Sequence, residues 1–177
     1  MIYFTSDLHF CHSRDFIYEP RGFKSAYSMT DKIAENIINT VKWDDDLYIL
    51  GDIMLNNNDY GIKVLKQLPG KKHIVIGNHD TEKRVELYQD VYNTEVIGVA
   101  TIMKYKGWSF YLSHYPTMLG SGAKCRKQKR FCLCGHTHTK NKYVDMPYGC
   151  YHVDVDAHDC FPVSADQVIE DILKAPL

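Results

Sequence analysis

The chain has 177 residues, of which 45% are hydrophobic and 24% are charged, so it is long enough to bury a sizeable apolar core. Its formal net charge of -1 argues against a protein that binds nucleic acid or membrane surfaces through general positive charge. No basic leader and no long apolar stretch follows Met1, so we expect a single cytoplasmic domain over residues 1–177 with no membrane contact.

The first half of the chain alternates short apolar runs with segments of helical periodicity. Ile2–Thr5, Leu47–Leu50 and Ile74–Ile76 are runs typical of buried strands. Between them, residues 30–42 and 60–68 carry apolar side chains at helical spacing, which predicts two amphipathic helices. This order predicts right-handed crossovers and a mainly parallel sheet with helices outside.

The second half has a different pattern. Residues 96–103 and 108–112 are β-rich and are separated by a Tyr-Lys-Gly turn, which predicts a hairpin in a second, more antiparallel sheet. Residues 131–134 and 151–155 are further strand candidates, and residues 165–173 have the pattern of a closing helix. The sequence therefore indicates an α/β fold with two sheets.

Polar side chains follow five of the apolar runs, at the point where each strand should end. In chain order they are Asp7, His9, Asp52, Asn78, His79, His114, His136 and His138. Ligands usually bind at the carboxyl ends of strands in open α/β sheets. Oxygen and imidazole donors suit Mn, Fe, Zn, Co or Ni, and this set is too large for one tetrahedral ion. Two ions fit better, and a carboxylate such as Asp52 can bridge them.

Two further groups are candidates for contact with a substrate. His12 and Arg14 follow the first polar cluster closely and could face the same cleft. Residues 117–130 lack periodicity and hold the densest run of positive charge, which includes Lys127, Lys129 and Arg130. This basic run has two interpretations, a solvated loop or an arm that holds a phosphate-bearing substrate.

The six cysteines are expected to be reduced, because nothing else in the sequence suggests secretion. Cys132 and Cys134 alternate along a predicted strand, so both sulfurs should point to one face of the sheet. We expect buried packing cysteines, with a structural zinc site as the less favoured alternative.

The ordered motifs resemble those of the calcineurin-like metallophosphoesterase family, with Asp-Leu-His at Asp7, Gly-Asp at Asp52, Gly-Asn-His-Asp at Asn78, Ser-His at His114 and Gly-His-Thr-His at His136. The resemblance spans almost the whole chain, and the chain is most similar to compact single-domain members from bacteria and their phages. It implies a four-layer α/β/β/α sandwich of two mixed sheets flanked by helices. It also implies a metal-dependent phosphoric ester hydrolase, with a phosphodiesterase favoured over a phosphomonoesterase.

The resemblance further implies two divalent transition-metal ions, with Mn favoured and Fe, Zn, Co or Ni as alternatives. The implied ligands are Asp7, His9 and His138 for one ion, Asn78, His114 and His136 for the other, and Asp52 for both. A hydroxide that bridges the ions would attack phosphorus, and His79 would protonate the leaving group. Asp80 and Asp59 are the candidates for orienting His79.

The expected partner is a phosphate-ester substrate, with a nucleotide-derived ester as one candidate. Two other functions compete with hydrolysis of a small ester. A non-catalytic scaffold of the same fold is disfavoured because the sequence keeps His79. A single-strand nuclease could use the basic run together with Tyr115 and Phe131 as stacking contacts, but the net charge makes nucleic acid a less favoured partner.

Overall fold

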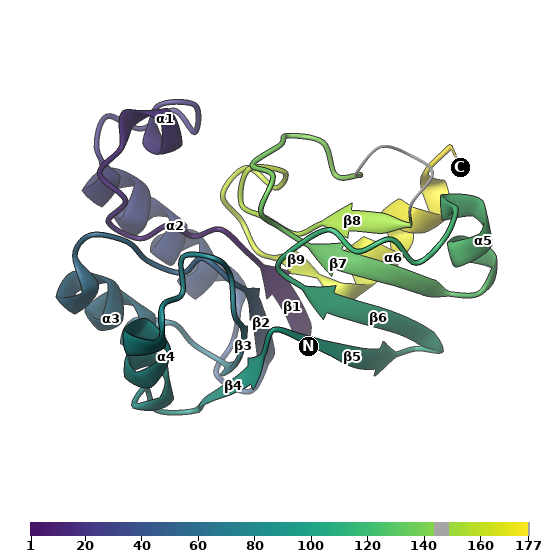
Figure 1. Ribbon diagram of the computed structural model, residues 1–177, viewed down its shortest axis with the longest axis horizontal. Coiled ribbons are helices and arrows are strands. Elements are labelled where there is room, and N and C mark those ends of the chain that lie inside the picture. Colours follow the sequence, from purple (N-terminus) through teal and green to yellow (C-terminus); the bar gives the residue numbers. More distant parts are fainter. Residues whose placement is uncertain (144–148, 177) are drawn as a thin grey trace.

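Two mixed β-sheets form the centre of the computed structural model, which describes residues 1–143 and 149–176 (Figure 1). The first sheet has the strand order β4-β3-β2-β1-β9. Its strands are β1 (Ile2–Thr5), β2 (Asp46–Leu50), β3 (Lys71–Val75), β4 (Thr94–Gly98) and β9 (Val163–Ser164). The strands β1 to β4 pair in parallel as predicted, and the short strand β9, which the sequence pattern did not indicate, pairs antiparallel with β1.

The second sheet has the order β5-β6-β7-β8. Its strands are β5 (Ala100–Tyr105), β6 (Trp108–Ser113), β7 (Arg130–Cys134) and β8 (Cys150–His152). The predicted hairpin is the antiparallel pair β5 and β6, whereas β6, β7 and β8 pair in parallel, so the second sheet is mixed. The predicted run 96–103 also divides, because Gly98 has a φ of 119° and the chain leaves the first sheet there.

Within residues 1–143 and 149–176, six helices flank the sheets. They are α1 (Asp15–Tyr18), α2 (Ala26–Thr40), α3 (Asn58–Gln67), α4 (Glu82–Gln89), α5 (Gly122–Lys127) and α6 (Ala165–Lys174). The structure therefore confirms the α/β class with two mixed sheets and flanking helices. Among the described residues, no helix is both long and apolar enough to cross a membrane.

Alternation along the strands divides the core between the two faces of the first sheet. Leu47 and Ile49 of β2 belong to one buried cluster, with the apolar stripe of α2 that includes Ile33 and Ile37. Leu50 belongs to the second cluster, which contains side chains of both sheets and of α6. The core therefore holds the carboxyl ends of strands from both sheets in fixed positions.

Helix α2 begins earlier than the sequence pattern predicts. Ser25 is its N-cap, and Ser25 and Ser28 form a reciprocal capping box. Thr30, the first residue of the predicted helix, lies inside α2, where its hydroxyl donates to the carbonyl of Ala26 and accepts from the backbone N–H of Cys11. The hydrogen bond from the backbone N–H of Cys11 to Thr30 tethers the loop after β1 to helix α2.

The cysteines are buried, as expected, and none forms a disulfide among the described residues. Cys132 and Cys134 share one face of β7 and cluster with Cys150, on the side away from Phe131 and Leu133. This arrangement agrees with the predicted packing role.

Candidate active site

The carboxyl ends of five strands bring the predicted site residues together. β1, β2 and β3 are parallel to one another, as are β6 and β7, so each set ends at one edge of its sheet. In Figure 1, β6 and β7 point toward the segment that follows β1. Short loops after these strands then carry the polar motifs into one cluster.

The backbone of these loops is strained where the motif side chains turn inward. Left-handed φ angles occur at non-glycine positions, with values of 56° at Asp7, 47° at His9, 56° at Asp52, 73° at His136 and 48° at His138. Such conformations cost on the order of 1–3 kcal/mol each and are concentrated at functional sites.

The motif glycines make room for the carboxylates of the cluster. A side chain at Gly77 would collide with the carboxylate of Asp52, and a side chain at Gly135 would collide with that of Asp7. Glycine is therefore required by close approach at both strand ends.

Asp7, His9 and His138 form the first group of donors. The Nε2 atoms of His9 and His138 lie 3.1 Å apart, and Asp7 Oδ1 lies 3.8 Å and 3.6 Å from them, respectively. Asp7 Oδ2 accepts hydrogen bonds from Ser6 Oγ and from the backbone N–H of His136. Asp7 Oδ1, in contrast, is buried and has no hydrogen-bond partner. Two facing ring nitrogens and an unpartnered carboxylate oxygen could hold one cation.

Asn78, His114 and His136 form the second group. Asn78 Oδ1 lies 2.9 Å from both His114 Nε2 and His136 Nδ1, and these two nitrogens are 3.2 Å apart. His114 Nδ1 lies 2.8 Å from the carbonyl oxygen of Leu50 and donates its proton there, so Nε2 is the ring nitrogen that faces the group.

Asp52 lies between the two groups. Its Oδ2 atom is 3.4 Å from His114 Nε2 and 3.7 Å from His9 Nε2. Its Oδ1 atom accepts a 2.8 Å hydrogen bond from the backbone N–H of His79. The side chain is buried, so one carboxylate oxygen faces donors of both groups while the other is occupied.

The charges of the cluster favour a bound cation. Burial raises the pKa of Asp7 to about 6, although His114 and His138 oppose that shift. Burial lowers the pKa of His114, but the carboxylates of Asp52 and Asp7 outweigh this and raise it to about 9. Two buried carboxylates thus attract positive charge to this point of the structure.

The calcineurin-like phosphoesterase superfamily domain matches residues 1–153 of this chain. The chain belongs to this superfamily. Its membership indicates a phosphoesterase hydrolase that acts on phosphate esters and uses divalent metal ions.

Several relatives of this phosphoesterase can be compared with it. MJ1445 of Methanocaldococcus jannaschii, an uncharacterized protein, is 26% identical over 179 residues, which cover 98% of this chain and 92% of that protein. The crystal structure of AQ665 from Aquifex aeolicus, a protein of unknown function, matches with a TM-score of 0.72 and 26% identity over 96% of this chain and 98% of that one. YfcE, a phosphoesterase from E. coli, matches with a TM-score of 0.46 and 16% identity over 86% and 77% of the two chains.

The residues present fit the divalent ions that the superfamily implies. The two donor groups combine carboxylate, amide and imidazole atoms, the mixture that transition metals accept. The unpartnered oxygen of Asp7 is costly in a buried site unless a cation or a proton compensates for it.

His79 lies at the rim of the phosphoesterase site. Its side chain is 42% exposed, and its Nε2 atom is 3.9 Å from Asp52 Oδ2. Arg84 donates a 2.6 Å hydrogen bond to the backbone carbonyl of His79 and so fixes the turn. The side chain is close enough to the donors to reach a bound substrate while it stays open to solvent.

Asp80 does not orient the His79 ring. Its carboxylate instead accepts hydrogen bonds from the backbone N–H groups of Asp52 and Gly77, at 2.8 Å and 2.9 Å, and from the hydroxyl of Tyr88 at 2.7 Å. Asp80 therefore connects the ends of β2 and β3. Asp59, the other candidate, is an exposed residue of α3.

The structure separates the predicted substrate contacts into two sets. His12 is buried, and its ring lies 5.1 Å from that of His9 and 6.2 Å from that of His79, so it joins the cluster. Arg14 is exposed at the N-cap of α1.

The basic run lies elsewhere in the structure. Arg130 pairs with Ser109 at the start of the parallel strands β6 and β7, whereas His114 and His136 follow their ends. At about 3.3 Å per residue, the five residues of β7 put the length of a strand, roughly 16 Å, between Arg130 and the cluster. This position favours the solvated-loop interpretation of Lys127, Lys129 and Arg130 over the arm that holds a substrate.

The structure bears on two further expectations for residues 117–130. This segment is partly helical, since it contains the short helix α5, whose N-cap is Ser121. The single-strand nuclease interpretation loses support, because Phe131 is buried and cannot stack on a base. Tyr115 is 50% exposed and packs beside His136, with ring centroids 4.6 Å apart.

Sequence reasoning missed two residues beside the site. Asp156 contacts His138, and Arg21 contacts Asp156 through a pair of hydrogen bonds. Asp156 follows the predicted strand 151–155, so the strand-end pattern that identified the other residues could also have identified it. Arg21 lies in the loop between α1 and α2, where no sequence pattern marks it.

Proposed function

We propose that this protein is a dinuclear metal-dependent phosphodiesterase. Asp52 carries the proposal, because its buried Oδ2 faces nitrogens of both donor groups, at 3.4 Å and 3.7 Å. In the proposed site, one ion is held by Asp7, His9 and His138, and the other by Asn78, His114 and His136. Asp52 is shared between them.

Bound divalent ions supply a water of lowered pKa and neutralise charge on the phosphate oxygens. The residues of the chain position these partners. Asp52 and Asp7 are held by bonds from backbone N–H groups, so they need no rearrangement when cations bind. Preorganised electrostatic groups of this kind supply much of the rate enhancement in phosphoryl transfer.

His79 is proposed to donate a proton to the departing oxygen. It is absent from both donor groups, and its ring is half exposed beside Asp52. A general acid typically contributes on the order of 10²–10⁴ in rate, with the largest effect on poor leaving groups. The buried His12, whose ring lies beside His79, would help to confine it to the rim.

A diester substrate is favoured by the charge around the cluster. A phosphomonoester brings about one negative charge more than a diester, and enzymes often meet such charge with a guanidinium. Arg21, the guanidinium that contacts His138, is already paired with the carboxylate of Asp156. Because Arg21 is already engaged by Asp156, it does not offer its charge to a second phosphate oxyanion, which suits the singly charged diester better.

The experiment compares the metal-free protein with protein reconstituted with Mn, Fe, Zn, Co or Ni. Each form is assayed on an aryl phosphodiester and on the matching monoester. We expect metal-dependent turnover with a higher kcat/KM for the diester. Equal or higher kcat/KM for the monoester would refute the diester preference, and turnover that needs no metal would refute the mechanism.

The matched variants are Asp52→Asn and Asp171→Asn. Both replace an acid of low exposure by its amide, but Asp171 lies on α6 and bonds to Tyr151 of the second sheet. Asp52→Asn should reduce the occupancy of both metals and bring activity near background, whereas Asp171→Asn should keep both. Full occupancy and normal turnover in Asp52→Asn would remove Asp52 from the site.

A further inference from the structure

We propose that Asp156 and Arg21 position His138, so that one of the two metal sites depends on this pair. The inference rests on the proposed function, because it takes His138 as a ligand. Asp156 Oδ2 lies 2.9 Å from His138 Nδ1. Arg21 holds the same carboxylate with its Nε and Nη2 atoms, at 2.8 Å from Oδ1 and 2.6 Å from Oδ2.

His138 needs such support more than His9 and His114 do. The side chain of His138 is 30% exposed, whereas His9 and His114 are 1% and 0% exposed, so packing holds those two rings. The backbone of His138 is also left-handed, with a φ of 48°. A ring on a strained, partly exposed turn keeps one orientation only if a directional bond holds it.

Asp156 also selects the tautomer of His138. An ionised carboxylate only accepts hydrogen bonds, so it favours the proton on Nδ1. Arg21 Nη2 also lies 3.1 Å from Nδ1, but its two protons are directed to Asp156 Oδ2 and to the carbonyl of Asp7. The lone pair of Nε2 then faces His9 and Asp7, where a cation would lie. An acidic partner on the opposite nitrogen also makes a histidine ligand more basic, and loss of such partners typically weakens metal binding by about 10–100-fold.

Arg21 connects this carboxylate to the first sheet. Its Nη2 atom donates a 3.0 Å hydrogen bond to the backbone carbonyl of Asp7, which follows β1. His138 comes from the segment after β7 in the second sheet. The buried guanidinium, which is 2% exposed, thus sets the position of Asp156 relative to the donors of β1. A lysine cannot reproduce the two-pronged contact.

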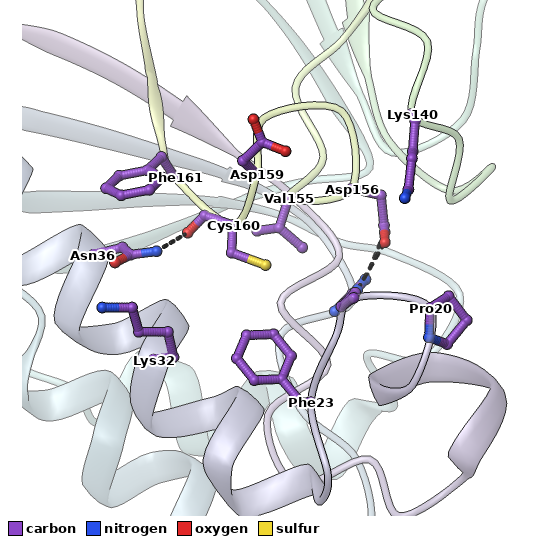
Figure 2. A pocket seen from close by; sticks show the side chains of 11 residues that line it. Pro20, Phe23, Lys32, Asn36, Lys140, Val155, Asp156, Asp159, Cys160 and Phe161 are labelled. Atoms are coloured by element: carbon purple, nitrogen blue, oxygen red, sulfur yellow. Dashed lines mark hydrogen bonds and ion pairs between the residues drawn. The ribbon is translucent and has the colours of Figure 1, made fainter.

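A cavity of about 310 Å³ adjoins the pair and makes the inference testable by chemical rescue. Arg21 and Asp156 form part of its wall, and Figure 2 shows Asp156 near Lys140, on the opposite side from Asn36 and Phe161. If the Asp156 side chain is shortened, a small carboxylate from solvent can enter through the cavity and take its place beside Arg21. Formate has the required shape and charge.

The test measures Mn²⁺ binding to the metal-free full chain by calorimetry. Wild type should bind two ions, and Asp156→Ala should bind one of them about 10–100-fold more weakly while the other site is unchanged. Formate in the tens of millimolar should restore the weakened site in Asp156→Ala and leave wild type unchanged. Asp171→Ala, which removes another acid that accepts three side-chain hydrogen bonds, should bind both ions like wild type.

Asp156→Asn tests the tautomer argument separately. The amide keeps the shape of the acid but can present an N–H to His138 Nδ1, which favours the tautomer with its proton on Nε2. We expect weaker binding at the same site. Arg21→Lys, which keeps the charge, should weaken that site as well, and it serves as the deciding variant if Asp156→Ala does not fold.

Three results would overturn the positioning role. These are wild-type affinity at both sites in Asp156→Ala or Arg21→Lys, wild-type affinity in Asp156→Asn, or a weakened site in Asp156→Ala that formate does not restore. A wild-type protein that binds no metal would instead contradict the proposed function itself.

Discussion

The carboxylate of Asp80 is expected to be a main determinant of the geometry of the site, although it contacts no proposed ligand side chain. It is buried, and it accepts hydrogen bonds from the backbone N–H groups of Asp52, Ile53 and Gly77 and from the Tyr88 hydroxyl. In Asp80→Ala these donors stay buried without partners. A buried donor left unsatisfied costs about 1–3 kcal/mol, so four of them predict a loss of roughly 4–12 kcal/mol in the free energy of unfolding.

The matched control is Tyr88→Phe, which removes one of the four hydrogen bonds and leaves the other three. It should cost about 0.5–1.5 kcal/mol, the usual net value of one hydrogen bond. Urea denaturation of the metal-free proteins measures both values without a contribution from bound ions. Because Asp80 connects the ends of β2 and β3, Asp80→Ala should also weaken metal binding, whereas Tyr88→Phe should change it little.

The reasoning would be refuted if Asp80→Ala unfolded at the same urea concentration as Tyr88→Phe with an unchanged m-value. That outcome would mean that the backbone donors find water or other partners when the carboxylate is removed. A variant too unstable to purify would be replaced by Asp80→Asn. Asp80→Asn keeps one acceptor oxygen and should lie between Asp80→Ala and wild type.

Three further predictions concern catalysis, pH and the basic run. His79→Ala should keep both metals but lose about 10²–10⁴ in rate on a diester with an alkyl leaving group, and much less on one that releases p-nitrophenolate; an equal loss on both substrates would contradict general acid catalysis. Hydrogen bonds from neighbouring side chains outweigh burial and lower the pKa of Asp171, so its stabilising effect is present above the unfolded value near 3.9 and is lost as pH falls through the folded value. The difference in Tm between wild type and Asp171→Asn should therefore close below about pH 4, and a constant difference would show that the charge is irrelevant. Neutralising Lys127, Lys129 and Arg130 together should leave KM unchanged for polyanionic and small diesters alike, and a selective rise for polyanions would place the basic run near the substrate after all.

The sequence by itself indicated the strands and the polar residues that follow them. Burial of a parallel sheet on both faces produces continuous apolar runs, and these are visible without a structure at Ile2–Thr5, Leu47–Leu50 and Ile74–Ile76. The strand-end rule then located Asp7 and Asp52, because the carboxyl ends of parallel strands meet at one edge. Apolar runs and the polar residues that follow them are local properties of the chain, so the order of residues alone is enough to identify them.

The division of residues 96–103 between two sheets depended on the tertiary structure. Its β-rich pattern is continuous, and only the position of the second sheet explains why the chain turns at Gly98. The position of the basic run also depended on the tertiary structure. The run joins two site segments in the sequence, but β7 crosses the whole sheet between Arg130 and His136, which puts the charges at the wrong end.

The supporting contacts also needed the structure. Asp80 is adjacent to His79 in sequence, yet its carboxylate turns back to the end of β2, because a side chain's direction is set by the conformation of its own turn. Arg21 and Asp156 are 135 positions apart, and only the packing of the two sheets brings them beside His138. Sequence periodicity reports which residues are buried or lie at strand ends, whereas contacts between distant segments are decided by how the sheets pack.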